Sequence, residues 1–391
     1  MSAPSSSSRL TILLAALEPS ADQIGAAFMD AMGKRRADVR FIGCGGPEMV
    51  KRGLVSLFPV DDFAVMGLAG AARVFFKAFA GARDLAQLAA EEGAHAAVLI
   101  DAWAFSRIAV TRLKRVAPMT KVFKLAAPQV WATRPERTKF VADHFDGVLC
   151  LLPFEPDLFR QAGARATFVG NPNFQTAWRT RGEGARFRSR HMLDDRPILC
   201  VLPGSRQGEV KRLAPVFGET VARLVRERPD LEIVCPPAPQ VRGAVETAIA
   251  SWGVPVRMVG PEEKADAFAA ARVALAASGT VTTELAINGA PMVVGYRVDP
   301  LTAAWARRAI IAEHVSIVNI TAGRAVVPEF LQENCTADAL TQELARLLDD
   351  ESARAVQTDA FPGILEALDI HGAAAEKAAG QLLDWLLSPS A

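Results

Sequence analysis

The stretch that best indicates the fold is Ile198-Leu199-Cys200-Val201-Leu202-Pro203-Gly204-Ser205-Arg206, after which a helical pattern runs from Gly208 to Arg228. An apolar run of strand length, a turn containing proline and glycine, and a helix together form one strand–loop–helix unit. In an open parallel sheet, ligands bind at such loops, beyond the carboxyl ends of the strands. The stretch therefore predicts a doubly wound α/β domain with a candidate binding loop after its first strand.

The same alternation of strand and helix extends in both directions along the chain. Apolar runs such as Thr11–Ala16, Ala96–Ile100 and Val273–Ala277 alternate with helical patterns, and within each run the apolar residues are continuous. Continuous apolar strands are typical of a parallel sheet that is covered on both faces. Between the two halves, the segment Gly170–Asp195 is polar and rich in arginine, and we interpret it as the linker region and the approach to a second domain.

A chain of 391 residues is long enough for two domains. We predict an α/β fold of the GT-B type, with two doubly wound Rossmann-like domains that face a central cleft. The predicted boundaries are 1–170 and 171–365, followed by C-terminal helices at 366–391 that pack back on the N-terminal domain or on a partner subunit. The pattern alone would also suit a two-domain epimerase, kinase or binding protein.

Composition excludes several classes of protein. The formal net charge is +1, which argues against a general nucleic-acid binder. The five cysteines and five histidines are scattered, so we expect reduced, buried cysteines in a cytoplasmic protein and neither a metal site nor a cofactor. Since no apolar run reaches about 18 residues, we expect any membrane contact to be peripheral.

Two loops of the second half are candidates for binding a diphosphate. In the first, Gly204 allows close approach of the backbone, Ser205 can donate a hydrogen bond, and Arg206 can pair with phosphate. The second loop carries Ser278, Gly279 and Thr280 at the start of a helix, and Glu284 one turn later could accept hydrogen bonds from a ribose. An ordinary turn and an ordinary helix cap remain alternative interpretations of the two loops.

Three places in the first half carry candidate chemistry. Glu18, Ser20 and Asp22 follow the first strand, where they could bind sugar hydroxyls or only cap a helix. Asp101 ends another strand and is a candidate general base, or else a solvated aspartate. The aromatic, partly basic segment 64–80 suits contact with acyl chains or a membrane, although a buried core helix is equally compatible with it.

Taken in order, these motifs resemble the lipid-A-disaccharide synthase family of inverting GT-B glycosyltransferases. The resemblance spans roughly residues 10 to 385. Each motif is short, but the ordered set is specific: Glu18–Ala26, Phe41–Gly43, Gly46–Met49, Ala64–Gly67, Ile100–Ala102, Ala127–Ala132, Leu152–Glu155, Leu202–Arg206, Ser278–Thr280 with Glu284, Pro291–Arg297 and Pro328–Gln332.

The resemblance implies a reaction and roles for residues. UDP-2,3-diacylglucosamine would glycosylate 2,3-diacylglucosamine 1-phosphate (lipid X), which gives UDP and the β-1,6-linked lipid A disaccharide 1-phosphate. Asp101 would act as base, and Arg206 would neutralise the leaving diphosphate. The roles implied for the other residues are UDP binding by Gly204, Ser205, Ser278, Gly279, Thr280 and Glu284, a sugar pocket formed by Glu18, Ser20, Asp22 and Asn319, and lipid or membrane contact by Val65, Met66, Leu68, Val74, Phe75, Phe76 and Phe79.

The resemblance also implies a homodimer with exchanged C-terminal portions that acts at the inner face of the inner membrane of a Gram-negative bacterium. Several motifs depart from the family pattern, mostly in the first half: Leu17 and Ala21 replace glycines, and Ala102-Trp103-Ala104-Phe105-Ser106 differs from the usual continuation after the aspartate. Two alternatives therefore stay open. One is a divergent paralogue that uses a UDP-sugar with another lipid acceptor, and the other is a non-catalytic lipid-binding relative.

Overall fold

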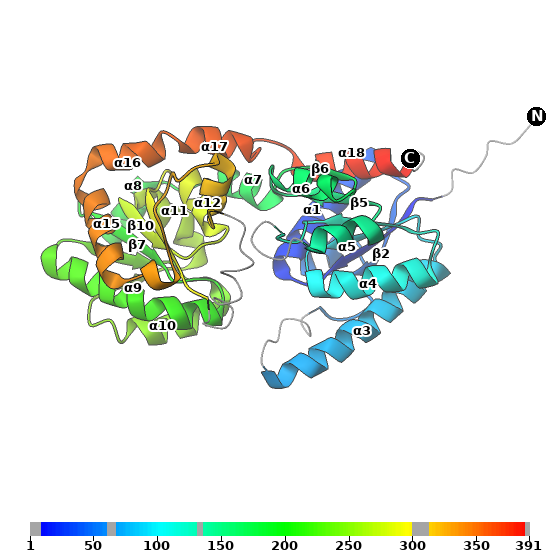
Figure 1. The fold of residues 1–391 in the computed structure, drawn as a ribbon, viewed down its shortest axis with the longest axis horizontal. Coiled ribbons are helices and arrows are strands. Elements are labelled where there is room, and N and C mark those ends of the chain that lie inside the picture. The colour runs from blue at the N-terminus through cyan, green and yellow to red at the C-terminus, as the bar shows by residue number, and fades with distance from the viewer. Residues whose placement is uncertain (1–8, 61–67, 131–135, 299–312, 388–391) are drawn as a thin grey trace, which may run out of the picture. The chain divides into compact units, whose positions relative to one another are not determined.

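The chain folds into two compact units. The computed structural model describes residues 9–60, 68–130, 136–298 and 313–387. One unit comprises Met1–Asn173 together with Gly372–Ala391, and the other comprises Phe174–His371. The chain therefore passes from one unit to the other twice, at 173–174 and at 371–372, whereas the sequence-based boundaries stood at 170–171 and 365–366. Each unit is a twisted sheet with helices packed on it (Figure 1).

The first unit is built on a six-stranded, fully parallel sheet with strand order β2-β1-β3-β4-β5-β6. Its strands β1 and β3 are buried along their whole length, as expected for a sheet covered on both faces. Their bounds are β1 Thr11–Ala16, β2 Arg40–Cys44, β3 Ala96–Ile100, β4 Lys121–Leu125, β5 Gly147–Cys150 and β6 Ala166–Phe168.

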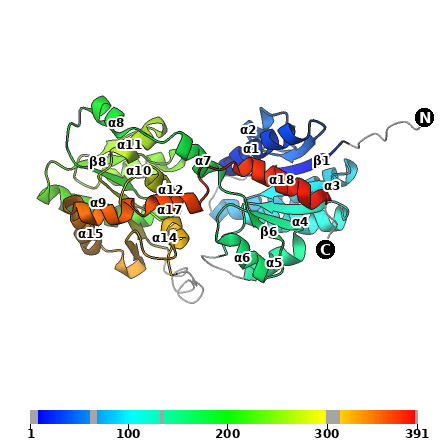
Figure 2. The ribbon, with the colours of Figure 1, turned by 90° about the horizontal axis from the view of Figure 1, so that it is seen from above.

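Helices connect these strands and cover the sheet. The described helices of this unit are α1 Pro19–Arg35, α2 Pro47–Val50, α3 Leu68–Glu91, α4 Trp103–Val116, α5 Glu136–His144, α6 Glu155–Gln161 and the C-terminal α18 Ala374–Leu387, and α7 Pro172–Arg179 begins at the crossing between the units. Although α18 comes last in the sequence, it packs beside α1 and buries Ala378, Ala379, Leu382 and Trp385 in the core that α1 shares with β1 and β3 (Figure 2).

The second unit repeats the architecture. Its six-stranded sheet is also parallel throughout, with order β12-β11-β10-β7-β8-β9. The strands are β7 Ile198–Leu202, β8 Glu232–Cys235, β9 Arg257–Met258, β10 Val273–Ala276, β11 Met292–Tyr296 and β12 Glu329–Leu331. The edge strand β12 was not predicted, because its Glu-Phe-Leu sequence is too short and too polar to give a strand signal.

The helices of the second unit include the long α9 on one face of the sheet and several successive shorter helices in the C-terminal part of the unit. Their bounds are α8 Gly184–His191, α9 Gln207–Glu227, α10 Arg242–Ile249, α11 Lys264–Ala270, α12 Val281–Ile287, α14 Ile317–Ala322, α15 Ala337–Asp349, α16 Glu351–Thr358 and α17 Phe361–Ala367, with 3-10 turns at Pro239–Val241, Pro261–Glu263 and Gln332–Asn334.

The segment from Gly170 to Asp195 corrects one prediction. It contains the crossing between the units at 173–174, but it is not an unstructured connection, because most of it forms α7 and α8. Phe174 and Phe187 are each about 1% exposed, and Arg186 forms a bidentate ion pair with Asp266 of α11. The many arginines made the segment look solvated, but their charged ends lie at the surface while the two aromatic rings pack inside.

Candidate active site

Two predicted carboxylates leave the first sheet at the same edge. Glu18 follows β1 and forms the N-cap of α1, and Asp101 follows β3. The strands β1 and β3 pair directly, with Ala16 opposite Ile100. Because the two strands are parallel, Glu18 and Asp101 both lie at the carboxyl edge of the sheet, where ligands of parallel α/β folds bind. Glu18 is exposed there and Asp101 is half-buried.

The next candidates on α1 differ in exposure. Ser20 is exposed, whereas Asp22 is only 4% exposed. The Asp22 carboxylate accepts hydrogen bonds from the backbone amides of Glu48 (2.8 Å) and Met49 (3.1 Å) at the start of α2. The structure thus gives Asp22 a structural role in holding α2 against α1, while contact of Glu18, Ser20 and Asp22 with a sugar stays a prediction.

The backbone at Asp101 has an unusual conformation. Asp101 and Ala102 both have positive φ, 49° and 42°, which costs about 1–3 kcal/mol for each non-glycine residue. Polar contacts hold this turn: the Asp101 amide donates to the Leu125 carbonyl (3.0 Å), and the Asp101 carbonyl accepts from Ser106 Oγ (2.8 Å). Backbone strain of this kind is concentrated at functional sites in proteins, which supports the choice of Asp101 as a site residue.

A lysine that the sequence reasoning missed lies under this turn. Lys124 of β4 is 0% exposed, and its ammonium donates to the carbonyl oxygens of Asp101 (2.6 Å), Leu99 (3.1 Å) and Leu125 (3.2 Å). Burial lowers the pKa of Lys124 to about 7, and the negative charges of Asp101 and Glu18 partly oppose that shift. The signal was present in the sequence, since a lysine inside the apolar strand Lys-Val-Phe-Lys-Leu calls for a buried partner.

In the second unit, the two predicted donor loops follow neighbouring strands. β7 ends at Leu202 and β10 ends at Ala276, and these two residues lie opposite each other in the sheet. The loops at 203–206 and 277–280 therefore share one edge of the sheet. The structure brings these candidates together from positions more than 70 residues apart, which is the arrangement that one diphosphate group would need.

The backbone amides of the first of these loops donate hydrogen bonds to an acidic side chain of the following helix, α9. Gly204 has φ 122°, a conformation that favours glycine. The Glu209 carboxylate accepts hydrogen bonds from the amides of Ser205 (3.0 Å) and Arg206 (3.3 Å), and it is itself buried. The Arg206 side chain is 76% exposed and makes a longer ion pair with Glu209 (3.5 Å). The guanidinium of Arg206 is therefore the cationic group of this loop that is presented to solvent.

The second loop has open space above it. Gly279 and Thr280 are exposed, and among the described residues a Cβ added to Gly279 would meet no heavy atom within 4 Å. Ser278 Oγ donates to the Val315 carbonyl (2.8 Å). Glu284, the predicted ribose ligand, is half-buried and forms an ion pair with Lys264 of α11. A ligand hydroxyl at Glu284 would share that carboxylate with Lys264.

Asn319 has a buried position. Its side chain is 0% exposed, accepts hydrogen bonds from the amides of Val326 (2.8 Å) and Val327 (2.9 Å), and donates to the Val327 carbonyl (2.8 Å). The amide group of Asn319 therefore shapes the chain that leads into β12. Its predicted contact with a sugar stays a prediction.

The predicted lipid segment is described only in part. Val65 and Met66 lie outside the described residues, as do the side chains of Leu68, Val74 and Phe75 in α3. Phe76 is 72% exposed on α3. Phe79 lines a cavity of about 440 Å³ between α3, α4 and α5, together with Ala104, Arg107, Ile108, Thr111, Arg112 and Phe140.

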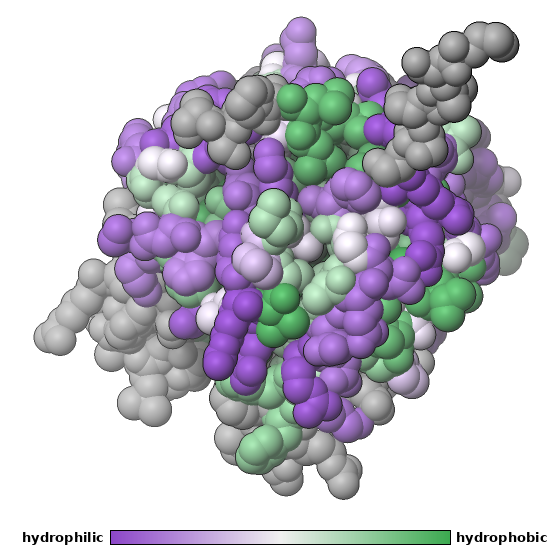
Figure 3. Space-filling model, turned by 90° about the vertical axis from the view of Figure 1, so that its right-hand side faces the viewer, coloured by the Kyte–Doolittle hydropathy of each residue, from purple (hydrophilic) through white to green (hydrophobic). Residues whose placement is uncertain are grey.

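The arginines of this cavity stack on its aromatic rings. Arg112 lies 5.9 Å from the ring centre of Phe79, and Arg107 lies 5.2 Å from that of Phe140. In the view of Figure 3, hydrophilic side chains predominate on the surface and hydrophobic ones form several separate patches. The combination of aromatic rings and cations is compatible with an amphiphilic ligand.

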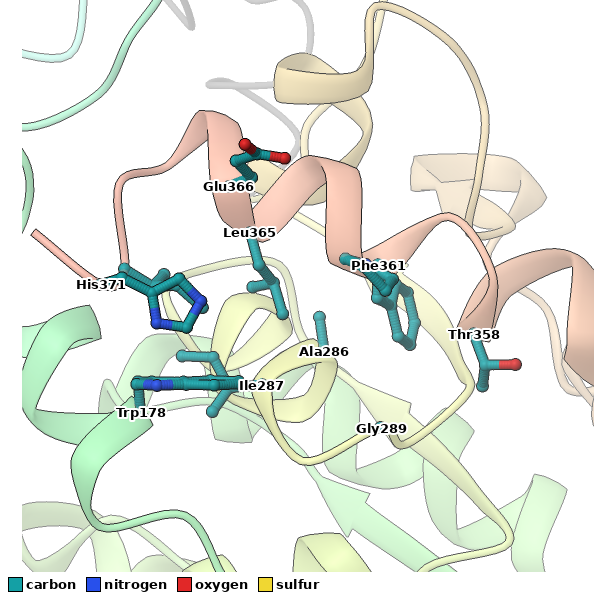
Figure 4. Close-up of a pocket in the computed structure, with 11 residues that line it drawn as sticks. Trp178, Ala286, Ile287, Gly289, Thr358, Phe361, Leu365, Glu366 and His371 are labelled. Atoms are coloured by element: carbon teal, nitrogen blue, oxygen red, sulfur yellow. The ribbon is translucent and has the colours of Figure 1, made fainter.

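Another cavity, of about 510 Å³, lies in the second unit away from the donor loops (Figure 4). It lies between α7, α12 and α17, where Phe361 and Leu365 of α17 point towards α12 and the rings of Trp178 and His371 meet edge to face at 4.5 Å. Its lining also includes Gly289 in the turn before β11, which places it towards the amino end of that strand. Because phosphate-binding loops lie at carboxyl ends, this cavity is not the predicted nucleotide site.

The described part of the chain offers no group of three or more His, Cys, Asp or Glu side chains that could hold a metal ion. All five cysteines are buried and free, and burial raises the pKa of the Cys44 and Cys235 thiols to about 12. Within the same described residues, no helix combines the length and apolarity that crossing a membrane requires.

Comparison with known proteins agrees with the motifs. A model of a family described as lipid-A-disaccharide synthetase matches residues 12–382. The chain is 42% identical over 353 residues to the lipid-A-disaccharide synthase of Rhodospirillum centenum, which covers 90% of this chain and 88% of that protein. It is 40% identical over 383 residues to the enzyme of the same name from Paramagnetospirillum magneticum, which covers 96% and 98% of the two chains.

Solved structures resemble the fold at low identity. A UDP-GlcNAc 2-epimerase from Neisseria meningitidis bound to UDP-GlcNAc matches with a TM-score of 0.59 at 11% identity, covering 96% of this chain and 99% of the other. A glycosyltransferase from Rickettsia africae matches with a TM-score of 0.57 at 12% identity, covering 97% and 100%. The predicted α/β fold with two doubly wound sheets, shared by GT-B glycosyltransferases and such epimerases, is confirmed.

Proposed function

The chain belongs to the lipid-A-disaccharide synthase family, and on that premise we propose which substrates it uses and which residues act on them. The family makes the lipid A disaccharide in lipid A biosynthesis, so the chain is a glycosyltransferase with a UDP-sugar donor and a lipid acceptor. The donor in our proposal is UDP-2,3-diacylglucosamine and the acceptor is 2,3-diacylglucosamine 1-phosphate. The two alternatives, another lipid acceptor or a non-catalytic relative, are not favoured by these relationships.

In the proposed reaction, Asp101 is the general base. Its carboxylate takes the proton from the 6-hydroxyl of the acceptor while the oxygen attacks the anomeric carbon of the donor. The bond from that carbon to the diphosphate breaks, UDP leaves, and a β-1,6 linkage forms. The observation that supports this role most directly is the strained turn at the end of β3, which holds Asp101 at the carboxyl edge of the sheet.

The second unit would supply the donor contacts. Arg206 presents an exposed guanidinium to solvent, and such a group can neutralise the charge that develops on the leaving diphosphate. Gly204 and Ser205 belong to the same loop, and the loop with Ser278, Gly279 and Thr280 follows the neighbouring strand. In this proposal Glu284 exchanges part of its ion pair with Lys264 for a ribose hydroxyl when UDP binds.

Membrane contact and dimerisation complete the proposal. The exposed Phe76 and the arginines beside Phe79 and Phe140 support peripheral contact at the inner face of the inner membrane. A homodimer with exchanged C-terminal portions would place the partner's copy of α18 where the chain's own α18 packs on α1. Analytical ultracentrifugation of the full chain tests this part, because a sedimentation coefficient of a monomer would exclude the exchange.

The decisive experiment measures UDP release from UDP-2,3-diacylglucosamine with and without the acceptor. We expect acceptor-dependent release by the unchanged protein and a loss of about 100-fold or more for Asp101→Asn, because general bases commonly contribute 10²–10⁴-fold. Asp157→Asn is the matched control, since Asp157 is a surface carboxylate of the same unit that pairs with Arg160. Release by Asp101→Asn at the rate of the unchanged protein would refute the assignment of the base.

Arg206→Ala tests the donor half separately. Isothermal titration with UDP alone should show weaker binding, because the variant lacks the exposed guanidinium that would face the diphosphate. Arg160→Ala, which removes a half-exposed arginine from the first unit, should leave the affinity for UDP unchanged. Equal UDP affinity for Arg206→Ala and the unchanged protein would remove Arg206 from the donor site.

A further inference from the structure

We propose that Lys124 is a positioning residue, which fixes the backbone turn at Asp101 and thereby aims the Asp101 carboxylate at the acceptor hydroxyl. The inference rests on the proposed role of Asp101 as base. It goes beyond that role because it identifies what holds the base in place, and it concerns a residue on a different strand.

The geometry of the ammonium is the first argument. An ammonium has three N–H donors, and those of Lys124 are directed to three carbonyl oxygens, which belong to Asp101, Leu99 and Leu125. The shortest of these contacts, at 2.6 Å, is the one to Asp101. Because Lys124 is completely buried, water cannot take over any of these hydrogen bonds, so the lysine joins the ends of β3 and β4 at one point.

The conformation of the turn is the second argument. Asp101 and Ala102 both adopt the left-handed region, which side chains other than glycine avoid. Such a conformation persists only where the surroundings hold it. Three contacts do so at Asp101: its amide donates to Leu125, and its carbonyl accepts from both Ser106 and Lys124. Of the three donors only Lys124 can carry a charge, and it also bonds the Leu125 carbonyl that the Asp101 amide uses.

The charges around the ammonium are the third argument. Two carboxylates act on Lys124, namely Asp101 from the turn after β3 and Glu18 from the turn after β1. Both are predicted site residues, and both leave the same edge of the sheet. A buried cation costs free energy unless it is compensated, so a lysine that served only to fill space would be a poor choice for this strand. The three carbonyl oxygens and the two negative charges together compensate the buried ammonium at the turn that carries Asp101.

The experiment compares Lys124→Met with Lys121→Met in the full chain. Lys121 is the other lysine of β4, at the opposite end of the strand, and its contact with the Trp385 carbonyl is long (3.5 Å). For Lys124→Met we expect kcat to fall about 10–100-fold, since misplacing a catalytic group by about 1 Å costs roughly that much. The KM for the donor and the affinity for UDP should stay within about twofold of the unchanged protein. Lys121→Met should retain the original kcat.

The split between kcat and KM separates positioning from a purely structural role. Positioning predicts a lower kcat with an unchanged KM for the donor, whereas a role in the fold alone predicts a lower free energy of unfolding with the original kcat. If Lys124→Met is folded by circular dichroism, with a kcat within twofold of the original, Lys124 serves the fold alone and the proposal is wrong.

Two further measurements keep the outcomes distinguishable. If Lys124→Met does not fold, Ser106→Ala removes the other side-chain donor to the same carbonyl, and an unchanged kcat would then overturn the proposal. A fall in kcat of several-fold with unchanged donor KM would support it. If Asp101→Asn itself retains full activity, the proposed base is wrong and the positioning role is overturned with it, whatever Lys124→Met shows.

Discussion

Trp385 and Gly147 form a contact whose energetics can be predicted in detail. Trp385, near the end of α18, is 5% exposed and stacks on Phe123 of β4 with ring centres 5.8 Å apart. The first residue of β5, Gly147, lies directly under the indole, because a Cβ built there would lie 2.5 Å from Cζ3 and 2.7 Å from Cε3 of Trp385. Glycine at position 147 is therefore required by the ring that covers it.

Replacing either partner should destabilise the first unit. Trp385→Ala should cost about 3 kcal/mol, the low end for a buried tryptophan, because the ring also lines an open cavity of about 610 Å³. Gly147→Ala should cost about 2 kcal/mol through overpacking. In the Trp385→Ala background the cost of Gly147→Ala should fall to about zero, because the three atoms nearest to the new methyl group all belong to Trp385.

The assay is equilibrium unfolding in urea, followed by far-ultraviolet circular dichroism, for the four proteins of this double-mutant cycle. Gly33→Ala in α1 is the matched control, since a Cβ there meets nothing within 4 Å, and it should be neutral or stabilising in both backgrounds. The reasoning is refuted if Gly147→Ala costs the same free energy with and without Trp385, because the two residues would then act independently.

Three further predictions concern pH, a buried amide and a helix cap. The folded-state pKa of Lys124 is lowered from 10.5 to about 7, so between pH 7 and 9 the unfolded chain binds more protons than the folded one. The free energy of unfolding should therefore increase from pH 7 to pH 9, and the increase should be about 2 kcal/mol larger for the unchanged protein than for Lys124→Met. Urea unfolding at the two pH values measures this difference, and an equal increase for both proteins would contradict the prediction. Asn319→Ala should destabilise the second unit by about 3 kcal/mol, because two buried backbone amides lose their acceptor, and a loss below 1 kcal/mol in urea unfolding would argue against the described contacts. Glu209→Ala should cost about 1 kcal/mol of stability as α9 loses its cap, yet calorimetry should find tighter UDP binding because two loop amides become free for the diphosphate; weaker binding would place the diphosphate elsewhere.

Local patterns sufficed to predict the strands of both sheets except the edge strand β12. Runs such as Ile198–Leu202 are apolar throughout and end at a turn containing glycine, so the strand, the loop and the following helix are all indicated by neighbouring residues. The same locality explains why the loops at Gly204 and Ser278 could be identified as candidates. They follow strands that proved to be neighbours in a parallel sheet, which places the loops at one edge.

Long-range packing decided what these patterns could not show. Arginine content made residues 170–195 resemble a linker, although Phe174 and Phe187 bury themselves in the second unit. β12 is a strand only because β11 offers it an edge, and its own three residues carry little preference. Likewise, the groups that donate hydrogen bonds to Asp22 and Asn319 are backbone amides farther along the chain. No local pattern therefore distinguishes these structural contacts from contacts with a ligand.

The sequence by itself determined the class of fold and the family, because hydrophobic periodicity and the order of short motifs are properties of residues close together in the chain. It also placed Asp101 and Arg206 at the ends of strands. Only the tertiary structure decided what surrounds them: Glu209 accepts hydrogen bonds from the amides of Ser205 and Arg206, and Lys124 donates from β4 to the carbonyl of Asp101. In both contacts a flexible, charged side chain that is removed from water must find hydrogen-bond partners inside the protein. Those partners come together only when the strands pair and pack.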